Sequence, residues 1–212
     1  AMAHGGPDDA GCYIDPQLPV ALGHRRLSII DTSAAGHQPM ASSDNRYQIT
    51  FNGEIYNYRE LRTELINLGY TFRTNTDTEV LLAGYAAWGE GLPERLRGMF
   101  AFVILDRTLG KLFAVRDHAG IKPLYFAKQG GDYFFTSEVR ALQKLDPDWE
   151  PDLDWPVLFL TFGFIPEPYT TLKNVRPIKK GHWMLFDIAD RTWKEEAWYH
   201  ASYTTKGGIS TE

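Results

Sequence analysis

The sequence has 212 residues, of which 43% are hydrophobic and 14% aromatic, enough apolar material for one substantial core. Its formal net charge is −5, and the Lys and Arg residues are scattered, so it lacks the basic patch typical of nucleic-acid-binding proteins. Charge or proline breaks every apolar run well short of the roughly 20 residues that span a bilayer, so we expect no membrane association.

The chain carries a single cysteine, Cys12, which excludes an internal disulfide and a cysteine-rich metal site and agrees with a reducing compartment. The first six residues lack the basic and apolar regions of a secretory signal, so we expect a cytoplasmic protein. Cys12 has no basic neighbour that would activate it, and we expect a small packed side chain there. The six histidines show no zinc-binding spacing, and we expect no metal.

Strand-like composition dominates the chain. The expected strands, most of them bounded by turn-forming residues, are residues 20–31, 47–51, 99–106, 111–116, 124–127, 133–137 and 182–188. Only short stretches, residues 108–110 and 129–132, separate two pairs of these runs. Such short connections favour antiparallel hairpins over helical crossovers.

A first helix is expected after Asn57, which is a favourable N-cap residue. Its leucines recur at spacings of four and three (Leu61, Leu65 and Leu68), and Gly69 is expected to end it. The resulting apolar stripe must face a sheet.

A second helix is expected to begin at the capping-box pattern that runs from Thr76 to Glu79. In such a box the threonine hydroxyl and the glutamate carboxylate each accept a hydrogen bond from a free backbone N–H. A weaker helix is expected at residues 137–145. The order of strands, two helices and strands predicts an α+β sandwich.

Asn52 and Gly53 follow a predicted strand and precede a predicted helix. The pair is typical of a turn. A side-chain amide beside an approachable glycine N–H also provides the two donors that hold an oxyanion during amide hydrolysis. The residues alone leave both interpretations open.

Several charged residues also allow both a structural and a functional interpretation. Arg26 lies in an apolar strand, where it could clamp a carboxylate with two hydrogen bonds, although such an arginine is more often in a surface ion pair. Asp77 lies in the first turn of a helix, where the helix dipole favours a carboxylate for structural reasons alone. Asp8 and Asp9 follow Gly-Pro and are more often turn formers than a paired acid–base site.

Taken in order, these segments resemble the class II glutamine amidotransferase domain of asparagine synthetases. The resemblance begins with His4-x-Gly6-Pro7-Asp8-Asp9-x-Gly11, Gly23-His24-Arg25-Arg26-Leu27-Ser28-Ile29-Ile30-Asp31 and Asn52-Gly53-Glu54-Ile55-Tyr56-Asn57. It continues with Thr76-Asp77-Thr78-Glu79-Val80, Gly98-Met99-Phe100-Ala101-Phe102, Arg116-Asp117-x-x-Gly120-Ile121-Lys122-Pro123-Leu124-Tyr125, Ser137-Glu138-x-x-Ala141-Leu142, Ile165-Pro166-x-Pro168 and Lys180-Gly181-His182.

The resemblance implies a four-layer αββα N-terminal nucleophile hydrolase, with two antiparallel sheets between helices. Residues 1–200 would form this domain, incomplete at its N-terminus, and residues 201–212 a polar tail or the start of a linker. The complete enzyme would hydrolyse glutamine to glutamate and ammonia through a thioester, for the amidation of aspartate. This chain would need no cofactor, whereas ATP and Mg would bind a C-terminal synthetase domain, its expected partner; a homodimer is left open.

The resemblance also assigns roles to individual residues. Arg26 would bind the α-carboxylate of glutamine, and the backbone of Leu27, Ser28, Ile29 and Ile30 would line the pocket. Asn52 and Gly53 would form the oxyanion hole. Glu54 and Asp77 would bind the α-ammonium group, so that opposite charges fix the two ends of the amino acid.

Two departures from the family pattern affect this assignment. The family's nucleophile is an N-terminal cysteine on a strand that precedes the histidine motif; it lies outside this sequence, Cys12 does not replace it, and we expect the chain alone to be inactive. The family's arginine after His4 is Gly5 here. Two alternatives therefore stay open: a glutamine-binding or interaction module without catalysis, and the domain of a related synthetase, such as a β-lactam synthetase, without glutaminase activity.

Overall fold

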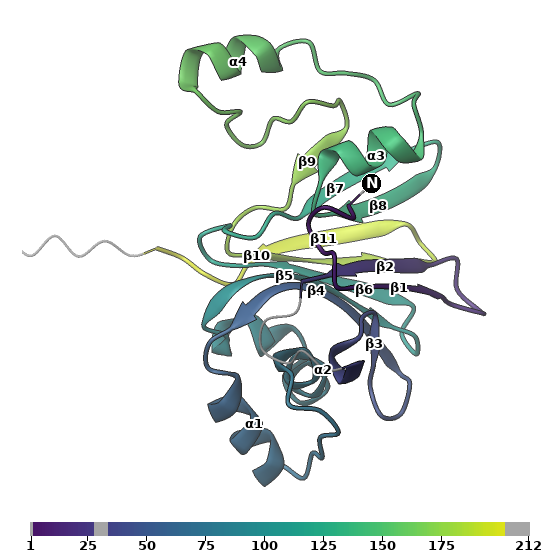
Figure 1. The fold of residues 1–212 in the computed structure, drawn as a ribbon, viewed down its shortest axis with the longest axis vertical. Coiled ribbons are helices and arrows are strands. Elements are labelled where there is room, and N and C mark those ends of the chain that lie inside the picture. Colours follow the sequence, from purple (N-terminus) through teal and green to yellow (C-terminus); the bar gives the residue numbers. More distant parts are fainter. Residues whose placement is uncertain (1, 28–33, 202–212) are drawn as a thin grey trace, which may run out of the picture.

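A six-stranded antiparallel sheet forms the centre of the fold in the computed structural model, which describes residues 2–27 and 34–201 (Figure 1). The strand order is β11-β10-β6-β5-β4-β3. The strands are β3 (Met40–Ala41), β4 (Tyr47–Ile55), β5 (Gly98–Asp106), β6 (Lys111–Arg116), β10 (His182–Asp187) and β11 (Thr192–Ala197). The antiparallel pairing of β5 with β6 confirms the hairpin expected around residues 108–110.

Two smaller antiparallel sheets lie beside the central one. One is the ribbon of β1 (Asp9–Ile14) and β2 (Ala21–Arg26), and the other has the order β8-β7-β9, with β7 (Tyr125–Gln129), β8 (Asp132–Thr136) and β9 (Val175–Pro177). Pairing of β7 with β8 confirms the second expected hairpin. Within the described ranges, β1 pairs only with β2 and β8 only with β7, so each keeps one open edge.

Helices α1 (Tyr58–Asn67) and α2 (Asp77–Trp88) cover one face of the central sheet (Figure 1). Side chains alternate along a strand, so every second residue of β4 points toward these helices. Ile49 and Phe51 of β4 are buried there against Leu65 of α1 and Leu81 of α2. The leucine stripe expected on the first helix therefore does face a sheet.

The opposite face of the central sheet packs against the two smaller sheets. Val103 and Leu105 of β5 are buried with Leu22 of β2 and Phe126 of β7. A third cluster lies beyond the small sheet, where Leu142 of α3 (Val139–Leu145) is buried among residues that include Ala127 and Trp149. The chain therefore has an α+β fold, as expected from its sequence.

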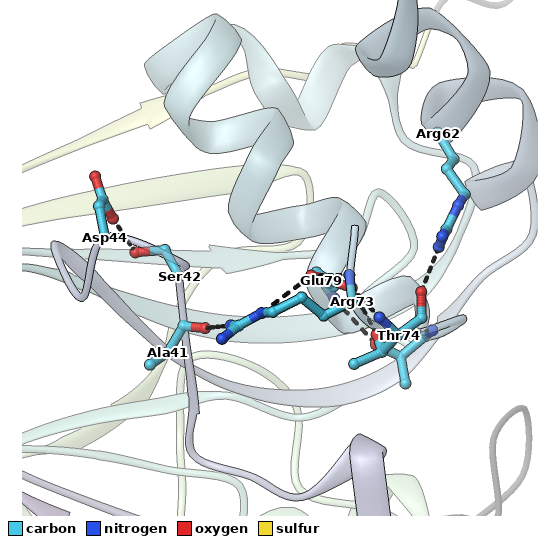
Figure 2. A network of polar contacts seen from close by, with 8 residues as sticks. Ala41, Ser42, Asp44, Arg62, Arg73, Thr74 and Glu79 are labelled. Carbon is cyan, nitrogen blue, oxygen red and sulfur yellow. Dashed lines mark hydrogen bonds and ion pairs between the residues drawn. The ribbon is translucent and has the colours of Figure 1, made fainter. Parts of the chain in front are cut away.

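The start of α2 corrects the capping-box prediction in one respect. The hydroxyl of Thr76 accepts the N–H of Glu79 at 3.2 Å, as expected. The carboxylate of Glu79, however, accepts the N–H groups of Arg73 and Thr74 rather than that of Thr76 (Figure 2). The Thr76 N–H donates instead to the hydroxyl of Thr74, because the preceding loop curls back over the helix end.

The start of α1 also differs from expectation. Asn57 is the N-cap residue, but its side chain makes no capping hydrogen bond. Its amide donates to the carbonyl of Arg95 and its oxygen accepts the N–H of Arg97, both at 2.9 Å. The side chain thus ties α1 to the short helix η2 (Gly89–Arg95).

Several elements were not predicted: β1, β3, β9, β11 and the helix α4 (Trp155–Phe162). Strand β11 is rich in charged residues and mostly exposed, so it lacks the alternation that marks a half-buried strand. Helix α4 is a short, continuous apolar run, which periodicity alone does not identify as helix or strand. It stands apart from the sheets at the top of Figure 1.

Candidate active site

The end of β4 carries the predicted oxyanion-hole residues. Asn52 alternates with the core-facing Phe51 and is exposed on the face of β4 opposite the helices. Gly53 has φ +146°, and a Cβ there would lie 2.1 Å from the carbonyl oxygen of Met99 on β5. Only glycine fits this position, so the backbone geometry alone explains why Gly53 follows Asn52.

Two carboxylates lie next to this pair. Oδ2 of Asp77 accepts the N–H of Ile55 at 3.0 Å, and Asp77 is 5% exposed. Burial raises the pKa of Asp77, hydrogen bonds from the N–H groups of Ile55 and Thr78 oppose the rise, and the negative charge of Glu54 adds to it. Glu54 and Asp77 thus form an acidic pair whose mutual repulsion a bound cation would relieve.

Arg26 lies at the end of β2 and is buried. Its guanidinium packs against Gly36, where a Cβ would lie 1.9 Å from Nη2. Leu27, predicted to line the pocket, is 58% exposed. Ser28, Ile29 and Ile30, predicted to do the same, lie outside the described residues.

Gln38 connects the segments that carry these residues, and the sequence did not identify it. Its Oε1 accepts the N–H of Phe51, next to Asn52, at 2.7 Å. Its Nε2 lies 3.5 Å from the hydroxyl of Thr78, next to Asp77. The side chain is buried and lies two residues beyond Gly36. No local pattern marks it, because its partners are 13 and 40 residues away.

A cleft of about 760 Å³ lies between the open edges of β1 and β8. Its lining includes Gly11 and Cys12 of β1, Asn52 of β4, and Phe135 and Thr136 of β8. Asn52 is the predicted site residue that lines the cleft. The other described ones, Arg26, Leu27, Gly53, Glu54 and Asp77, lie outside that lining.

Cys12 corrects an expectation. It is exposed and lines the cleft instead of packing in the core. The reason is the alternation along β1, where Tyr13 packs on the core while Ala10 and Cys12 face outward.

His24 of β2 also lines the cleft. Its Nδ1 lies 3.3 Å from the hydroxyl of Thr50, two residues before Asn52. Burial, with a further contribution from the positive charge of Arg26, lowers the pKa of His24 to about 4. The cleft therefore contains a neutral imidazole at pH 7.

The position at which the resemblance predicts arginine, Gly5, lies beside Glu138 in the lining of the cleft. A Cβ on Gly5 would lie 3.7 Å from Oε1 of Glu138. In this chain Arg140 pairs with that carboxylate at 2.6 Å, and Nε2 of His4 lies 3.2 Å from it. A positive charge beside Glu138 is therefore retained through Arg140.

Asp9, the second of the two aspartates that follow Gly-Pro, lies beside a histidine. Asp9 begins β1, and its Oδ2 lies 2.7 Å from Nδ1 of His37. Across residues 2–27 and 34–201, no three His, Cys, Asp or Glu side chains are grouped so that they could hold a metal ion. In the same ranges, no helix has the length and apolar character needed to cross a bilayer.

Comparison with known proteins identifies the family of the chain. The family described as "Glutamine amidotransferase domain" matches residues 1–199. The chain is 44% identical over 180 residues to asparagine synthetase [glutamine-hydrolyzing] 1 of Bacillus subtilis, covering 85% of this chain and 28% of that protein. It is 36% identical over 210 residues to putative asparagine synthetase [glutamine-hydrolyzing] 2 of Methanocaldococcus jannaschii, covering 90% of this chain and 40% of that protein.

A solved structure supports the fold. The glutamine phosphoribosylpyrophosphate amidotransferase of Bacillus subtilis superposes with a TM-score of 0.61 at 24% identity, covering 85% of this chain and 35% of the other. The present chain thus spans well under half the length of these relatives. It belongs to the glutamine amidotransferase family, as a class II domain related to the N-terminal domains of asparagine synthetases.

Proposed function

We propose that this chain is the glutamine-hydrolysing domain of an asparagine-synthetase-type enzyme. The observation that carries the proposal is that β2 and α2 both contact β4, so that three groups lie on adjoining elements: buried Arg26, the donor pair Asn52–Gly53, and the acidic pair Glu54–Asp77. A free amino acid with an amide side chain needs this combination, a cation for its carboxylate, carboxylates for its ammonium and two donors for its amide oxygen.

In this proposal each group acts on one part of glutamine. Arg26 binds the α-carboxylate through two parallel hydrogen bonds. Glu54 and Asp77 bind the α-ammonium, which offsets their repulsion. The amide oxygen then lies at the Asn52 side chain and the Gly53 N–H, which stabilise the negative charge that develops as the carbonyl is attacked.

The nucleophile in this proposal is a cysteine on a strand that precedes Ala1 and lies in the cleft. Both walls of the cleft are strands with an open edge, β1 and β8, and such edges readily pair with a further strand. The added strand would join the two smaller sheets into one. The fold would then be a four-layer αββα sandwich, with α1 and α2 on one side and α3 on the other.

The chemistry is amide hydrolysis in two steps. The cysteine thiolate attacks the amide carbon of glutamine, ammonia leaves, and a thioester remains. Water then attacks the thioester carbon and releases glutamate and the free thiol. Ammonia would pass to a further domain that activates aspartate with ATP and Mg. The names of the B. subtilis and M. jannaschii relatives, glutamine-hydrolysing asparagine synthetases, support this acceptor.

Ammonia release tests the proposal. The 1–212 chain is expected to release no ammonia from glutamine, whereas the polypeptide of the complete reading frame is expected to release it and to lose the activity when its N-terminal cysteine becomes alanine. Turnover by the 1–212 chain that is lost in Cys12→Ala would overturn the assignment of the nucleophile. Glutamine binding without any turnover in the complete polypeptide would identify a non-catalytic binding module instead.

A further inference from the structure

The N–H groups along one edge of β4 are held by side chains on both sides of the predicted oxyanion hole. In an antiparallel sheet, alternate residues of a strand direct their N–H groups to the same edge. The N–H of Phe51 donates to Oε1 of Gln38 at 2.7 Å, and the N–H of Ile55 donates to Oδ2 of Asp77 at 3.0 Å. Gly53 lies midway between these two residues, so its N–H points to the same edge.

The partner of Gly53 on β5 supports this orientation. The register places Gly53 opposite Phe100. The backbone of Phe100 faces away from β4, because its N–H donates to Oδ2 of Asp117 at 3.2 Å and its carbonyl accepts the N–H of Asp117 at 2.8 Å. Gly53 and Phe100 therefore form a pair without mutual hydrogen bonds. Within residues 2–27 and 34–201, no side chain accepts the Gly53 N–H, which can thus meet a substrate oxygen.

Gln38 lies where the strand pairing along this edge of β4 stops. Strand β3 begins at Met40, which pairs with Ile49. Continued by two residues in the antiparallel register, residue 38 falls opposite Phe51. The oxygen that accepts the Phe51 N–H comes from the Gln38 side chain, however, and not from a strand carbonyl. The side chain therefore extends the hydrogen bonding of this edge to the residue directly before Asn52.

Contacts on its other sides hold Gln38 in place. The residue is 6% exposed, and its Nε2 lies 3.5 Å from the hydroxyl of Thr78 in the first turn of α2. A Cβ on Gly11 of β1 would lie 2.0 Å from the carbonyl oxygen of Gln38, so β1 packs directly on the Gln38 backbone. Close packing of this kind restricts the side chain, and its Oε1 keeps a fixed position beside β4.

We propose that Gln38 is a positioning residue for the hydrolysis of glutamine. By accepting the Phe51 N–H, it fixes the edge of β4 so that the Asn52 amide and the Gly53 N–H are directed at the oxygen that becomes negative in the transition state. Gln38 itself contacts no part of the substrate in this arrangement. The inference rests on the proposed function, because it takes Asn52 and Gly53 to be the oxyanion donors.

Steady-state kinetics of ammonia release by the polypeptide of the complete reading frame test the inference. Gln38→Met has a similar volume but no oxygen for the Phe51 N–H. Because a displaced donor acts mainly on the transition state, kcat is expected to fall at least about 10-fold while KM for glutamine changes less than about 3-fold. Gln38→Glu keeps an oxygen for Phe51 and can accept the Thr78 hydroxyl, so its kcat is expected to stay within about 3-fold of the unmodified value.

The matched control is Gln48→Met, the same substitution at a glutamine of β4 that is 5% exposed and pairs with Ala41 of β3. It is expected to leave kcat and KM unchanged. A second measurement needs no turnover: in nitrogen-15 NMR spectra of the 1–212 chain, Gln38→Met is expected to shift the Gly53 backbone amide and the Asn52 side-chain amide, and Gln48→Met is expected to leave both in place.

The outcomes separate this inference from the proposed function. An active unmodified polypeptide whose kcat survives Gln38→Met, or whose Gln38→Glu variant is as slow as Gln38→Met, contradicts only the positioning role. Loss that appears in KM alone does the same. An unmodified polypeptide that releases no ammonia contradicts the proposed function, and unchanged Gly53 and Asn52 resonances in Gln38→Met then show independently that Gln38 does not orient the two donors.

Discussion

The carboxylate of Asp77 accepts the N–H of Ile55 at 3.0 Å, which fixes the first residue of α2 against the end of β4. Asp77 therefore has a structural partner on the same strand that carries Asn52 and Gly53. The group proposed to bind the substrate ammonium is held in place before substrate arrives.

Replacing Asp77 by asparagine separates these two roles. Asp77→Asn keeps an oxygen acceptor for the Ile55 N–H and removes a buried negative charge. Because burial raises the pKa of Asp77, its charge destabilises the folded protein at pH 7, and the free energy of unfolding of the variant is expected to stay the same or increase. Glutamine affinity is expected to fall at least about 10-fold, as for loss of a charge-assisted hydrogen bond. Calorimetry and urea unfolding measure the two quantities; unchanged affinity would remove Asp77 from the ammonium site.

His24 predicts a loss of stability in acid. Burial lowers its pKa in the folded protein to about 4, below the usual value near 6.5. The unfolded chain therefore takes up this proton first, so the stability contribution is complete above pH 6.5 and is lost as the pH falls toward 4. A shift of this size corresponds to on the order of 3 kcal/mol. In His24→Gln, the free energy of unfolding measured in urea is expected to change less between pH 7 and pH 4.5 than in the unmodified chain. The control His200→Gln changes an exposed histidine and is expected to leave this pH dependence unchanged.

Arg116 is expected to stabilise the fold far more than its ion pair suggests. Its side chain, 7% exposed, donates to the carbonyls of Ile178, Gly120 and Lys122 as well as to Glu167. Arg116→Ala leaves those carbonyls without their donor and is expected to cost about 3 kcal/mol. Glu167→Gln removes only a half-exposed charge and is expected to cost less than about 1 kcal/mol. Equal losses in urea unfolding would contradict this account.

Gly53 tolerates no side chain. Its φ of +146° and the carbonyl of Met99 at 2.1 Å from a built Cβ both oppose Gly53→Ala, which is expected to lower the free energy of unfolding by about 3 kcal/mol or more. Gly23→Ala is the control, because nothing lies within 4 Å of the Cβ position there. If the two variants unfold at the same urea concentration, the close approach of Gly53 to the Met99 carbonyl at the end of β4 is contradicted.

Local signals predicted the parts of the fold that depend on local physics. The hairpin of β5 and β6 follows from two strand-like runs and a short turn, and α2 begins directly after Thr76 because the hydroxyl of this residue caps the helix. Strand β11 escaped prediction because its charged residues lie on an exposed sheet edge, and α4 because its eight residues have no polar face.

The candidate site shows the same division. The Asn52–Gly53 pair is visible as a dipeptide, whereas Gln38 contacts residues far away in the sequence and only the fold reveals it. Burial of Arg26 likewise depends on Gly36, ten residues further along, and the exposure of Cys12 depends on the alternation of a strand that composition did not predict. The position and exposure of these residues therefore depend on contacts between segments that are distant in the sequence, which local patterns do not predict.

Calorimetric titration of the 1–212 chain with glutamine, and with glutaramate, which lacks the α-ammonium group, tests the central claim most directly. The account predicts that glutamine binds, that glutaramate binds at least about 10-fold more weakly, and that Arg26→Ala weakens both ligands to a similar degree. Equal binding of the two ligands, or glutamine binding that survives Arg26→Ala, would contradict a site built from Arg26, Asn52, Gly53, Glu54 and Asp77.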